Sequence, residues 1–371
     1  MSKLKLTAAI LGLFVIIGAG IFLLRAAQPN IVLAPEEIFT LGPLTVVNTL
    51  ITAVFITIFL SLISYLATRN MKLVPSGLQN VVEAAVEAYY NIVKGVAGDA
   101  KARIFIPLAG TIFIFIAFSN GAGLLPIFGA VGKFVDAEHV LEHELDIEEE
   151  GDVELVKASG SSFNFIGIDP DTIEVEFFPE SATFDGPDGE EHEVTYAESD
   201  DPHDKAHIIT EGLAEAGYDP EQYGHLLPLF RSVNTDLTVP LSMAIVAFIF
   251  IEYMGFRALG IGYMRKFINF SGKGIVEKLI NAFVGLLEAF GEIIRIVSLT
   301  FRLFGNTLAG EVLLIMVVFL APLLVVQVFY GLELMFALIQ AFIFSILTVV
   351  FASIAMESHG PGDEHGDSEH H

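Results

Sequence analysis

The sequence predicts an all-α polytopic membrane protein with about five to six membrane helices, the last two forming a long tilted helical hairpin, and with a small acidic extracytoplasmic insert of mixed α/β character. The chain of 371 residues is 53% hydrophobic with a mean hydropathy of +0.64. Several apolar runs approach the roughly 20 residues that a helical membrane span requires. The formal net charge of -26 is confined to one segment, because residues 131–230 hold 28 acidic and 3 basic residues and leave 17 and 16 elsewhere. The acidity therefore belongs to an inserted region and is not an adaptation of the whole surface.

The composition also excludes several kinds of chemistry. The chain contains no cysteine and no tryptophan. Disulfide frameworks, thiolate metal sites, cysteine nucleophiles and iron–sulfur clusters are therefore excluded. We expect no cofactor, no metal in the functional site and no nucleic-acid partner.

The chain is expected to contain five regions. Residues 1–27 are predicted as an N-terminal anchor helix or signal peptide, since Lys3 and Lys5 precede an apolar run that fits both. The other predicted regions are the first part of the membrane domain (28–130), the acidic insert (131–230), the second part of the membrane domain with the helical hairpin (231–357) and a polar tail (358–371).

The apolar runs predict the membrane spans in order. Single spans are expected at Pro43–Ala67, Ile104–Phe128 and Leu237–Gly260. The region from Ile275 to Met356 is too long for one span and too poor in charge for a loop, so it predicts two long helices folded back on each other. Pro322 and Gly331 indicate the turn region between them.

Lysine and arginine residues predict the orientation. They cluster between the spans Pro43–Ala67 and Ile104–Phe128 and again after the span Leu237–Gly260, so both connections should be cytoplasmic. These residues are Arg69, Lys72, Lys94, Lys101, Arg103, Arg257, Arg265, Lys266, Lys273 and Lys278. The insert is then extracytoplasmic and the C-terminal tail cytoplasmic, in a multi-pass protein of the cell inner (plasma) membrane.

Within the insert, alternating and turn-forming segments favour a packed module over disorder. Strands are predicted at FNFIGID, TIEVEFF and the pair SATFD and EEHEVTY around GPDG, and a helix at KAHIITEGLAEAG. His203, His207 and Glu211 have a spacing that could hold a metal, but a solvated helix face is favoured because acidic segments often produce this pattern. Three roles stay open for the insert: a solvated cap, a contact surface for another protein and a cation-attracting mouth.

Arg302 lies inside a long apolar stretch, where a charge costs roughly 3 to more than 10 kcal/mol, so a function should require it. A helical period places a polar stripe along this segment. The stripe contains Glu288, Glu292, Arg295, Ser298, Arg302 and Asn306, with Glu311 further toward the outside on the opposite face. For Glu292 and Arg295, an i, i+3 ion pair and a role in transport both fit the spacing.

The returning helix supplies further polar residues. Counted from the predicted turn, Gln340 should meet Arg302 at a similar depth, and Glu333 should lie near Glu311. A continuous aqueous path would not need a fixed cation midway, but two half-paths that must stay separate would. The pattern therefore predicts that Arg302 blocks a leak and attracts a carboxylate carried past it by a partner.

Four segments of the chain resemble subunit a of the rotary F-type ATP synthase. They are RLFGNTLAGE (302–311), LIQAFIFSILTVVF (338–351), PLAGTIFIFIAFSNGAGLLPIFG (107–129) and RSVNTDLTVPLSMA (231–244). The resemblance covers most of the chain outside the N-terminal run and the insert. It implies a stator subunit, not an enzyme by itself, that offers two offset half-channels to the carboxylates of a rotor c-ring. The implied partners are the c-ring, peripheral-stalk subunit b, other ATP synthase subunits and the lipid bilayer, with a proton favoured over sodium as the translocated ion.

The resemblance also implies roles for single residues. Arg302 matches the essential arginine of the family, and Glu288 matches a carboxyl of the cytoplasmic half-channel. The other matching ion-path residues are Asn120, Asn306, Glu311, Glu333 and Gln340. An aspartate that is frequent near the inlet is replaced here by Gly123, and relatives have a short loop where this chain has the acidic insert.

Two other functions compete with this interpretation. An independent secondary ion transporter would also bury carboxyls and arginine, but the sequence shows no internal repeat with paired broken helices. A noncatalytic scaffold for other subunits would leave Arg302 without a reason.

Overall fold

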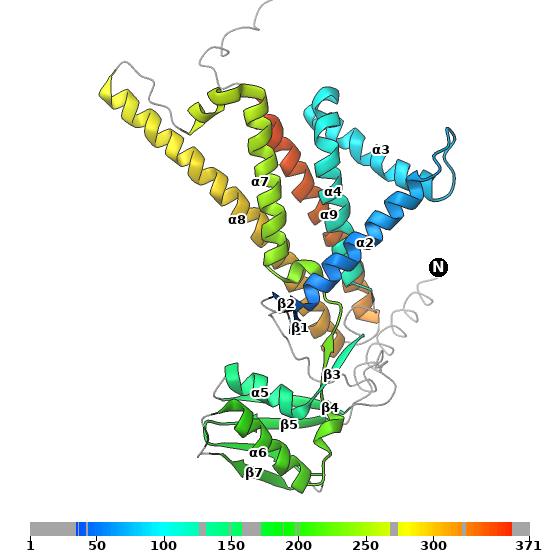
Figure 1. The fold of residues 1–371 in the computed structure, drawn as a ribbon, viewed down its shortest axis with the longest axis vertical. Coiled ribbons are helices and arrows are strands. Elements are labelled where there is room, and N and C mark those ends of the chain that lie inside the picture. The colour runs from blue at the N-terminus through cyan, green and yellow to red at the C-terminus, as the bar shows by residue number, and fades with distance from the viewer. Residues whose placement is uncertain are drawn as a thin grey trace, which may run out of the picture. The chain divides into compact units, whose positions relative to one another are not determined.

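The structure is a computed structural model that describes residues 35, 37–41, 44–125, 131–147, 150–157, 172–187, 189–196, 199, 201–267, 274–320 and 324–357. Within these residues five helices are long and apolar enough to cross a membrane. This confirms the predicted helical membrane protein, whose element order is shown in Figure 1. The predicted N-terminal helix, the strand at FNFIGID, the turn residue Pro322 and the polar tail lie outside the described residues.

The five long helices match the predicted spans with shifted ends. They are α2 (Asn48–Thr68), α4 (Asp99–Gly123), α7 (Thr238–Leu259), α8 (Ile275–Leu320) and α9 (Leu324–Ala355). The span predicted at Ile104–Phe128 was placed too late in the sequence, because its helix already includes the charged residues from Asp99 onward and ends at Gly123. Gly331 was also wrongly assigned to the turn, since it lies inside α9, where an apolar helical pattern continues on both sides.

Outside the insert, sequence reasoning missed helix α3 (Leu78–Ala97), because it interpreted this segment as part of a basic connection. The helix is amphipathic and buries Tyr89 and Val93 on its apolar face. Gly77 and Gly98 flank it with positive φ angles of 60° and 78°, which glycine adopts without a steric penalty. Burial raises the pKa of the Tyr89 hydroxyl to about 12, and its ring stacks on Phe113 of α4 at 4.7 Å.

The chain divides into two compact units, which are described separately. One unit comprises Met1–Thr52, Ala122–Ser232 and Ala309–Leu334, and the other Ala53–Gly121, Val233–Leu308 and Met335–His371. Helices α2, α4, α8 and α9 therefore contribute residues to both units.

In the second unit, four helices share one apolar cluster. Small residues on α7 and α9 allow the backbones to approach closely, which favours helix association in a membrane. The buried members are Ile112, Ile116, Ala244, Ala247, Leu299, Leu303, Ala341 and Phe344. Beside it, a second cluster joins α3, α4, α7, α9 and the 3-10 helix η3 (Gly260–Lys266). Helix α8, which carries the polar stripe, thus packs against its neighbours through Leu299 and Leu303.

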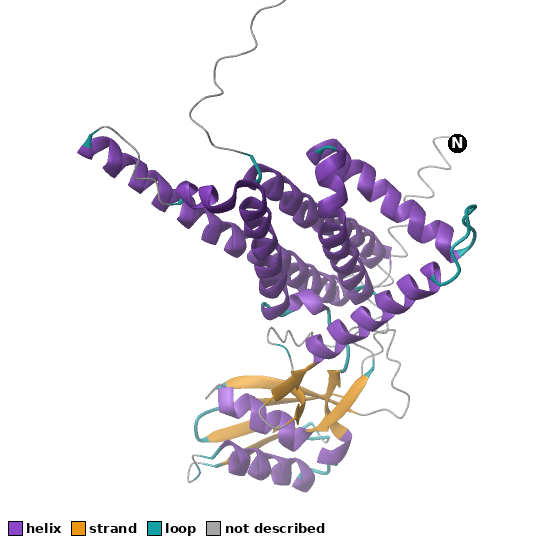
Figure 2. Ribbon diagram, turned by 45° about the horizontal axis from the view of Figure 1, so that its top comes forward, coloured by secondary structure: helices purple, strands orange, loops and turns teal. Residues whose placement is uncertain are grey.

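In the first unit, a short hairpin of β1 (Glu37–Leu41) and β2 (Leu44–Val47) precedes α2. The insert forms a six-stranded antiparallel sheet in the order β3-β8-β4-β5-β6-β7. The strands are β3 (Gly132–Asp136), β4 (Gly151–Lys157), β5 (Thr172–Phe177), β6 (Ser181–Asp185), β7 (Glu191–Thr195) and β8 (Tyr223–Pro228). Two helices lie side by side against this sheet, as Figure 2 shows, namely α5 (Ala137–Ile147) and α6 (Pro202–Glu215).

Alternation explains why so acidic a segment folds. On β5, Ile173, Val175 and Phe177 are buried while Glu174 and Glu176 between them are exposed. The predicted strands at TIEVEFF, SATFD and EEHEVTY and the predicted helix are confirmed. Strands β3, β4 and β8 and helix α5 were not predicted.

The two ends of the insert are neighbours. Strands β3 and β8 pair along their length, and Leu229 N donates to Val131 O at 2.8 Å just beyond them. Gly224 is required in this pairing, because a Cβ at that position would overlap the carbonyl oxygen of Val135. The first and last strands of the insert therefore lie side by side in one sheet.

We predict that the insert depends on this core for its stability. Leu155 on β4 is fully buried, so Leu155→Ala should destabilise the module by about 2–5 kcal/mol. Amide hydrogen exchange of β4, β5 and β6 in the detergent-solubilised complex should then be faster by about 30-fold or more. The control Glu174→Ala replaces an exposed side chain of the same sheet. Equal protection in both variants would contradict a packed core.

Candidate functional site

Arg302 lies on α8 with its side chain exposed, and its neighbour Phe301 is also exposed. Among the residues that the structure describes, none forms a hydrogen bond or an ion pair with the guanidinium of Arg302. Lipid chains cannot stabilise a charge in this position. Arg302 is thus a permanent cation without an ionic partner in the described part of the chain.

One helical turn further along α8, an amide pair joins the two hairpin helices. Asn306 Nδ2 donates to Oε1 of Gln340 on α9 at 2.9 Å. The prediction that Arg302 itself would meet Gln340 was therefore wrong in detail. A long helical side chain extends toward the N-terminus of its own helix, which carries the guanidinium away from Gln340. Gln340 is buried, and its Nε2 has no hydrogen-bond partner within the described residues.

Asn120 belongs to a buried polar network that sequence reasoning missed. Asn234 Nδ2 donates to Oδ1 of Asn120 at 2.5 Å and to Oγ of Ser119 at 3.1 Å. Thr307 Oγ1 on α8 also donates to Asn120 Oδ1 at 3.4 Å. The available signal was the polar run in RSVNTD just before α7. The network links α4, α8 and the 3-10 helix η2 (Val233–Thr235).

Glu292 is the buried centre of an ion cluster. Lys266 Nζ from η3 lies 2.7 Å from its Oε1, and Arg295 donates to its other oxygen from one turn along α8. The guanidinium of Arg295 also lies 3.8 Å from the ring centroid of Phe351 on α9. The sequence left two roles open for Glu292 and Arg295, an ion pair and a part in transport. The structure shows the ion pair and adds Lys266 to it. Glu288, one turn earlier, is half-buried and is not part of this cluster.

In the first unit, two carboxyls come from the facing ends of the hairpin helices. The carboxylate of Glu333 packs against Gly310, where a Cβ would overlap its oxygens. Glu333 therefore lies beside the residue that precedes Glu311, which agrees with the predicted approach of the two side chains. Their pairing as an ion relay stays a prediction.

Glu311 has a cationic neighbour that was not predicted. Arg231 Nε lies 3.4 Å from Glu311 Oε1, and the two side chains are 8% and 30% exposed. The other carboxylate oxygen of Glu311, Oε2, is buried without a hydrogen-bond partner in the described part of the chain. Gly123, which replaces a frequent aspartate, faces Ser232, because a Cβ there would lie 3.0 Å from the Ser232 Cβ and Oγ.

Comparison with known proteins assigns the family. The sequence profile of the family described as ATP synthase A chain matches residues 47–149 and 206–353. The chain belongs to this family. It is 26% identical to ATP synthase subunit a of Gloeobacter violaceus over 326 residues, covering 88% of this chain and 89% of that protein. It is 23% identical to the subunit a of Helicobacter acinonychis over 299 residues, covering 81% and 85%.

A subunit a of Campylobacter jejuni is 34% identical over 137 residues, which cover 36% of this chain and 58% of that protein. The predicted family resemblance is thus confirmed, and with it a multi-pass membrane subunit of the ATP synthase. The family match omits residues 150–205, which form most of the acidic insert. The matched residues therefore include the membrane helices and both ends of the insert, but not its central part.

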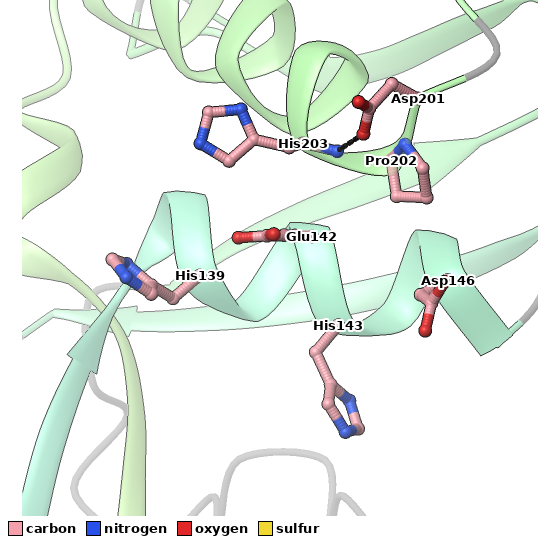
Figure 3. Close-up of a pocket in the computed structure, with 7 residues that line it drawn as sticks. All are labelled: His139, Glu142, His143, Asp146, Asp201, Pro202 and His203. Atoms are coloured by element: carbon pink, nitrogen blue, oxygen red, sulfur yellow. Dashed lines mark hydrogen bonds between the residues drawn. The ribbon is translucent and has the colours of Figure 1, made fainter.

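The insert contains a shallow pocket of about 420 Å³ between α5 and α6. Its lining residues are His139, Glu142, His143, Asp146, Asp201, Pro202 and His203. Figure 3 shows that these side chains diverge, with His143 directed away from the helix that carries His203. Asp201 caps α6 by accepting from the backbone N of His203 at 3.1 Å. No group of three or more potential ligands that could hold a metal is found among the described residues, and His207 lies 3.9 Å from Glu211 on the α6 surface.

We predict that Glu292 is required for the stability of this family member. Glu292→Ala would leave Lys266 and Arg295 partly buried without their shared carboxylate, a loss of about 3–5 kcal/mol. The apparent melting temperature of the detergent-solubilised complex should fall. Glu288→Ala, in the same helix but outside the cluster, is the control. Identical melting temperatures in the two variants would contradict a stabilising role for the cluster.

Proposed function

We propose that this chain is the stator subunit of the ATP synthase membrane sector that offers two offset half-channels to the carboxylates of a rotor c-ring. Protons move to and from these carboxylates, and the flow is coupled to rotation and ATP synthesis. The observation that carries the proposal is Arg302, an exposed cation on a membrane helix with no partner among the described residues. A rotor carboxylate passing along α8 would be that partner.

The exposed position of Arg302 fits a transient ion pair. Nearby on α8, Val297 and Phe301 are exposed apolar side chains, as expected of a surface that faces another apolar element. An arginine stays protonated at all physiological pH values, so it can release a rotor carboxylate only when that group is protonated or moves on. The same fixed charge repels protons that would cross directly between the half-channels.

The other polar residues are assigned to the two sides of Arg302. Glu311, Glu333 and Asn120 would serve the outer half-channel, and Glu288 the cytoplasmic one. Asn306 and Gln340 would line the central region next to Arg302, where the free Nε2 of Gln340 is available as a donor.

The orientation and partners follow from the same proposal. The acidic insert would be extracytoplasmic and the C-terminus cytoplasmic, in the cell inner membrane, since the basic connections flank the opposite helix ends. The c-ring and the peripheral-stalk subunit b would be direct partners. The insert would be a solvated accessory domain, because its apolar residues are used in its own core.

The independent transporter is less well supported. Transporters of that kind bind their ions at paired discontinuous helices. Here α8 is a single helix of 46 residues and α9 one of 32 residues through the polar region.

We predict that Arg302→Ala abolishes ATP-driven proton pumping, because it removes the permanent cation that would attract the rotor carboxylate. Pumping is measured in inverted membrane vesicles by the quenching of a pH-sensitive dye. The control is Arg257→Gln, which removes an exposed arginine at the end of α7 and should leave pumping intact. Wild-type pumping in the alanine variant would refute the proposed function.

We also predict that Glu311→Gln and Glu333→Gln each slow pumping without dissolving the complex, because each removes one proton-binding carboxyl from the outer half-channel. A slowing of about 10-fold corresponds to roughly 1.4 kcal/mol in the transport barrier. Subunit content after purification serves as the assembly control. Normal pumping by both single variants and by the double variant would mean that the outer half-channel runs elsewhere.

A further inference from the structure

Arg231 lies where the insert rejoins the membrane domain, between β8 and η2. Its backbone is fixed, because Arg231 N donates to Oγ1 of Thr52 at 3.2 Å near the start of α2. Asn48 of the same helix donates to the carbonyl of Pro228, three residues earlier, at 3.3 Å. The side chain is 8% exposed, so the chain buries a permanent cation at this point.

The buried guanidinium forms an ion pair with Glu311 of α8. Arg231 Nε lies 3.4 Å from Glu311 Oε1, while Glu311 Oε2 is buried without a hydrogen-bond partner in the described residues. The two oxygens of the carboxylate are therefore in different surroundings. The other titratable group at this place is Glu333 of α9, which packs against Gly310.

We propose that Arg231 is a positioning residue for proton uptake at Glu311, holding one carboxylate oxygen and leaving the other to receive the proton. The inference rests on the proposed function, in which Glu311 belongs to the outer half-channel. A cation close to a carboxyl favours its charged form, which is the form able to accept a proton. Burial alone would favour the neutral form and leave Glu311 occupied.

The proton balance of this step is simple. A proton from the outer aqueous side binds Oε2 of the carboxylate and gives a neutral carboxylic acid. Arg231 keeps its own protons throughout, because a guanidinium is not deprotonated in proteins. The carboxylic acid then passes its proton to the next acceptor toward the rotor, and the carboxylate and its ion pair are restored.

The test compares Arg231→Gln, Arg231→Lys and wild type in the intact complex reconstituted into vesicles. The measurement is the rate of ATP synthesis as a function of the pH on the outer side. Arg231→Gln should move the half-maximal rate by about one pH unit or more toward higher pH, because the buried carboxyl then binds protons more readily. Arg231→Lys should keep the wild-type profile, since the charge remains, with a lower maximal rate because the oxygen is no longer held.

Two further measurements separate this role from a structural one. In a Glu311→Gln background, adding Arg231→Gln should leave the pH profile unchanged, because the group through which Arg231 acts is missing. A shift of the same size in that background would overturn the proposal, as would a wild-type profile for assembled Arg231→Gln. If Arg231→Gln does not assemble, the Arg231→Lys variant provides the test. A wild-type pH profile together with a wild-type maximal rate in that variant would overturn the proposal.

Arg302→Ala and Arg257→Gln are measured in the same series. Synthesis by Arg302→Ala would refute the proposed function whatever Arg231 does. Loss of synthesis in Arg302→Ala together with a wild-type profile in Arg231→Gln would refute the role of Arg231 alone.

Discussion

The cost of an uncompensated charge in an apolar surrounding is the constraint on which the polar part of this structure depends. Glu292 is buried and is held between Lys266 and Arg295. Glu311 is held by Arg231, which comes from a segment eighty positions earlier in the chain. In the unit that contains Glu292, the membrane helices pack through small residues at their contacts. Arg302 departs from the pattern, because the described residues supply no such compensation for it.

Local patterns in the sequence predicted much of the fold. Apolar runs of span length predicted the long helices. Counting residues from the expected turn predicted that the α8 segment around Arg302 and Asn306 lies beside the α9 segment around Gln340. Alternation of apolar and acidic residues predicted β5, because exposed Glu174 and Glu176 alternate with its three buried apolar side chains. Such features depend on neighbours in sequence, so a period of 2.0 or 3.6 residues is sufficient to find them.

The parts that were missed depend on tertiary contacts or on mixed signals. Helix α3 carries enough charge to look like a connection, and its apolar face becomes meaningful only beside Phe113 of α4. The network around Asn234 and the pair of Arg231 with Glu311 join segments distant in sequence. No period in the sequence links position 231 to position 311, so the carboxyl was predicted and the cation beside it was not. For Gln340, the predicted partner was Arg302 and the observed one is Asn306, one helical turn away. The prediction did not consider that a long arginine side chain extends toward the N-terminus of its helix.

The two arginines differ in a way that the proposed function requires. A guanidinium paired with a carboxylate of its own chain, as Arg231 is with Glu311, has little capacity to attract a second carboxylate, because the ion pair balances its charge. Such a cation can tune a proton-binding group but cannot exchange partners. Arg302 is exposed and uncompensated within the described chain, so a carboxylate on a moving partner would gain the full interaction on arrival. That gain must remain small enough to be reversed when the partner moves on, and water in the half-channels would reduce it, since the interaction weakens as the local dielectric rises. A stator of this kind therefore needs both a satisfied and an unsatisfied arginine, and burial of the first together with exposure of the second is the arrangement that separates their tasks.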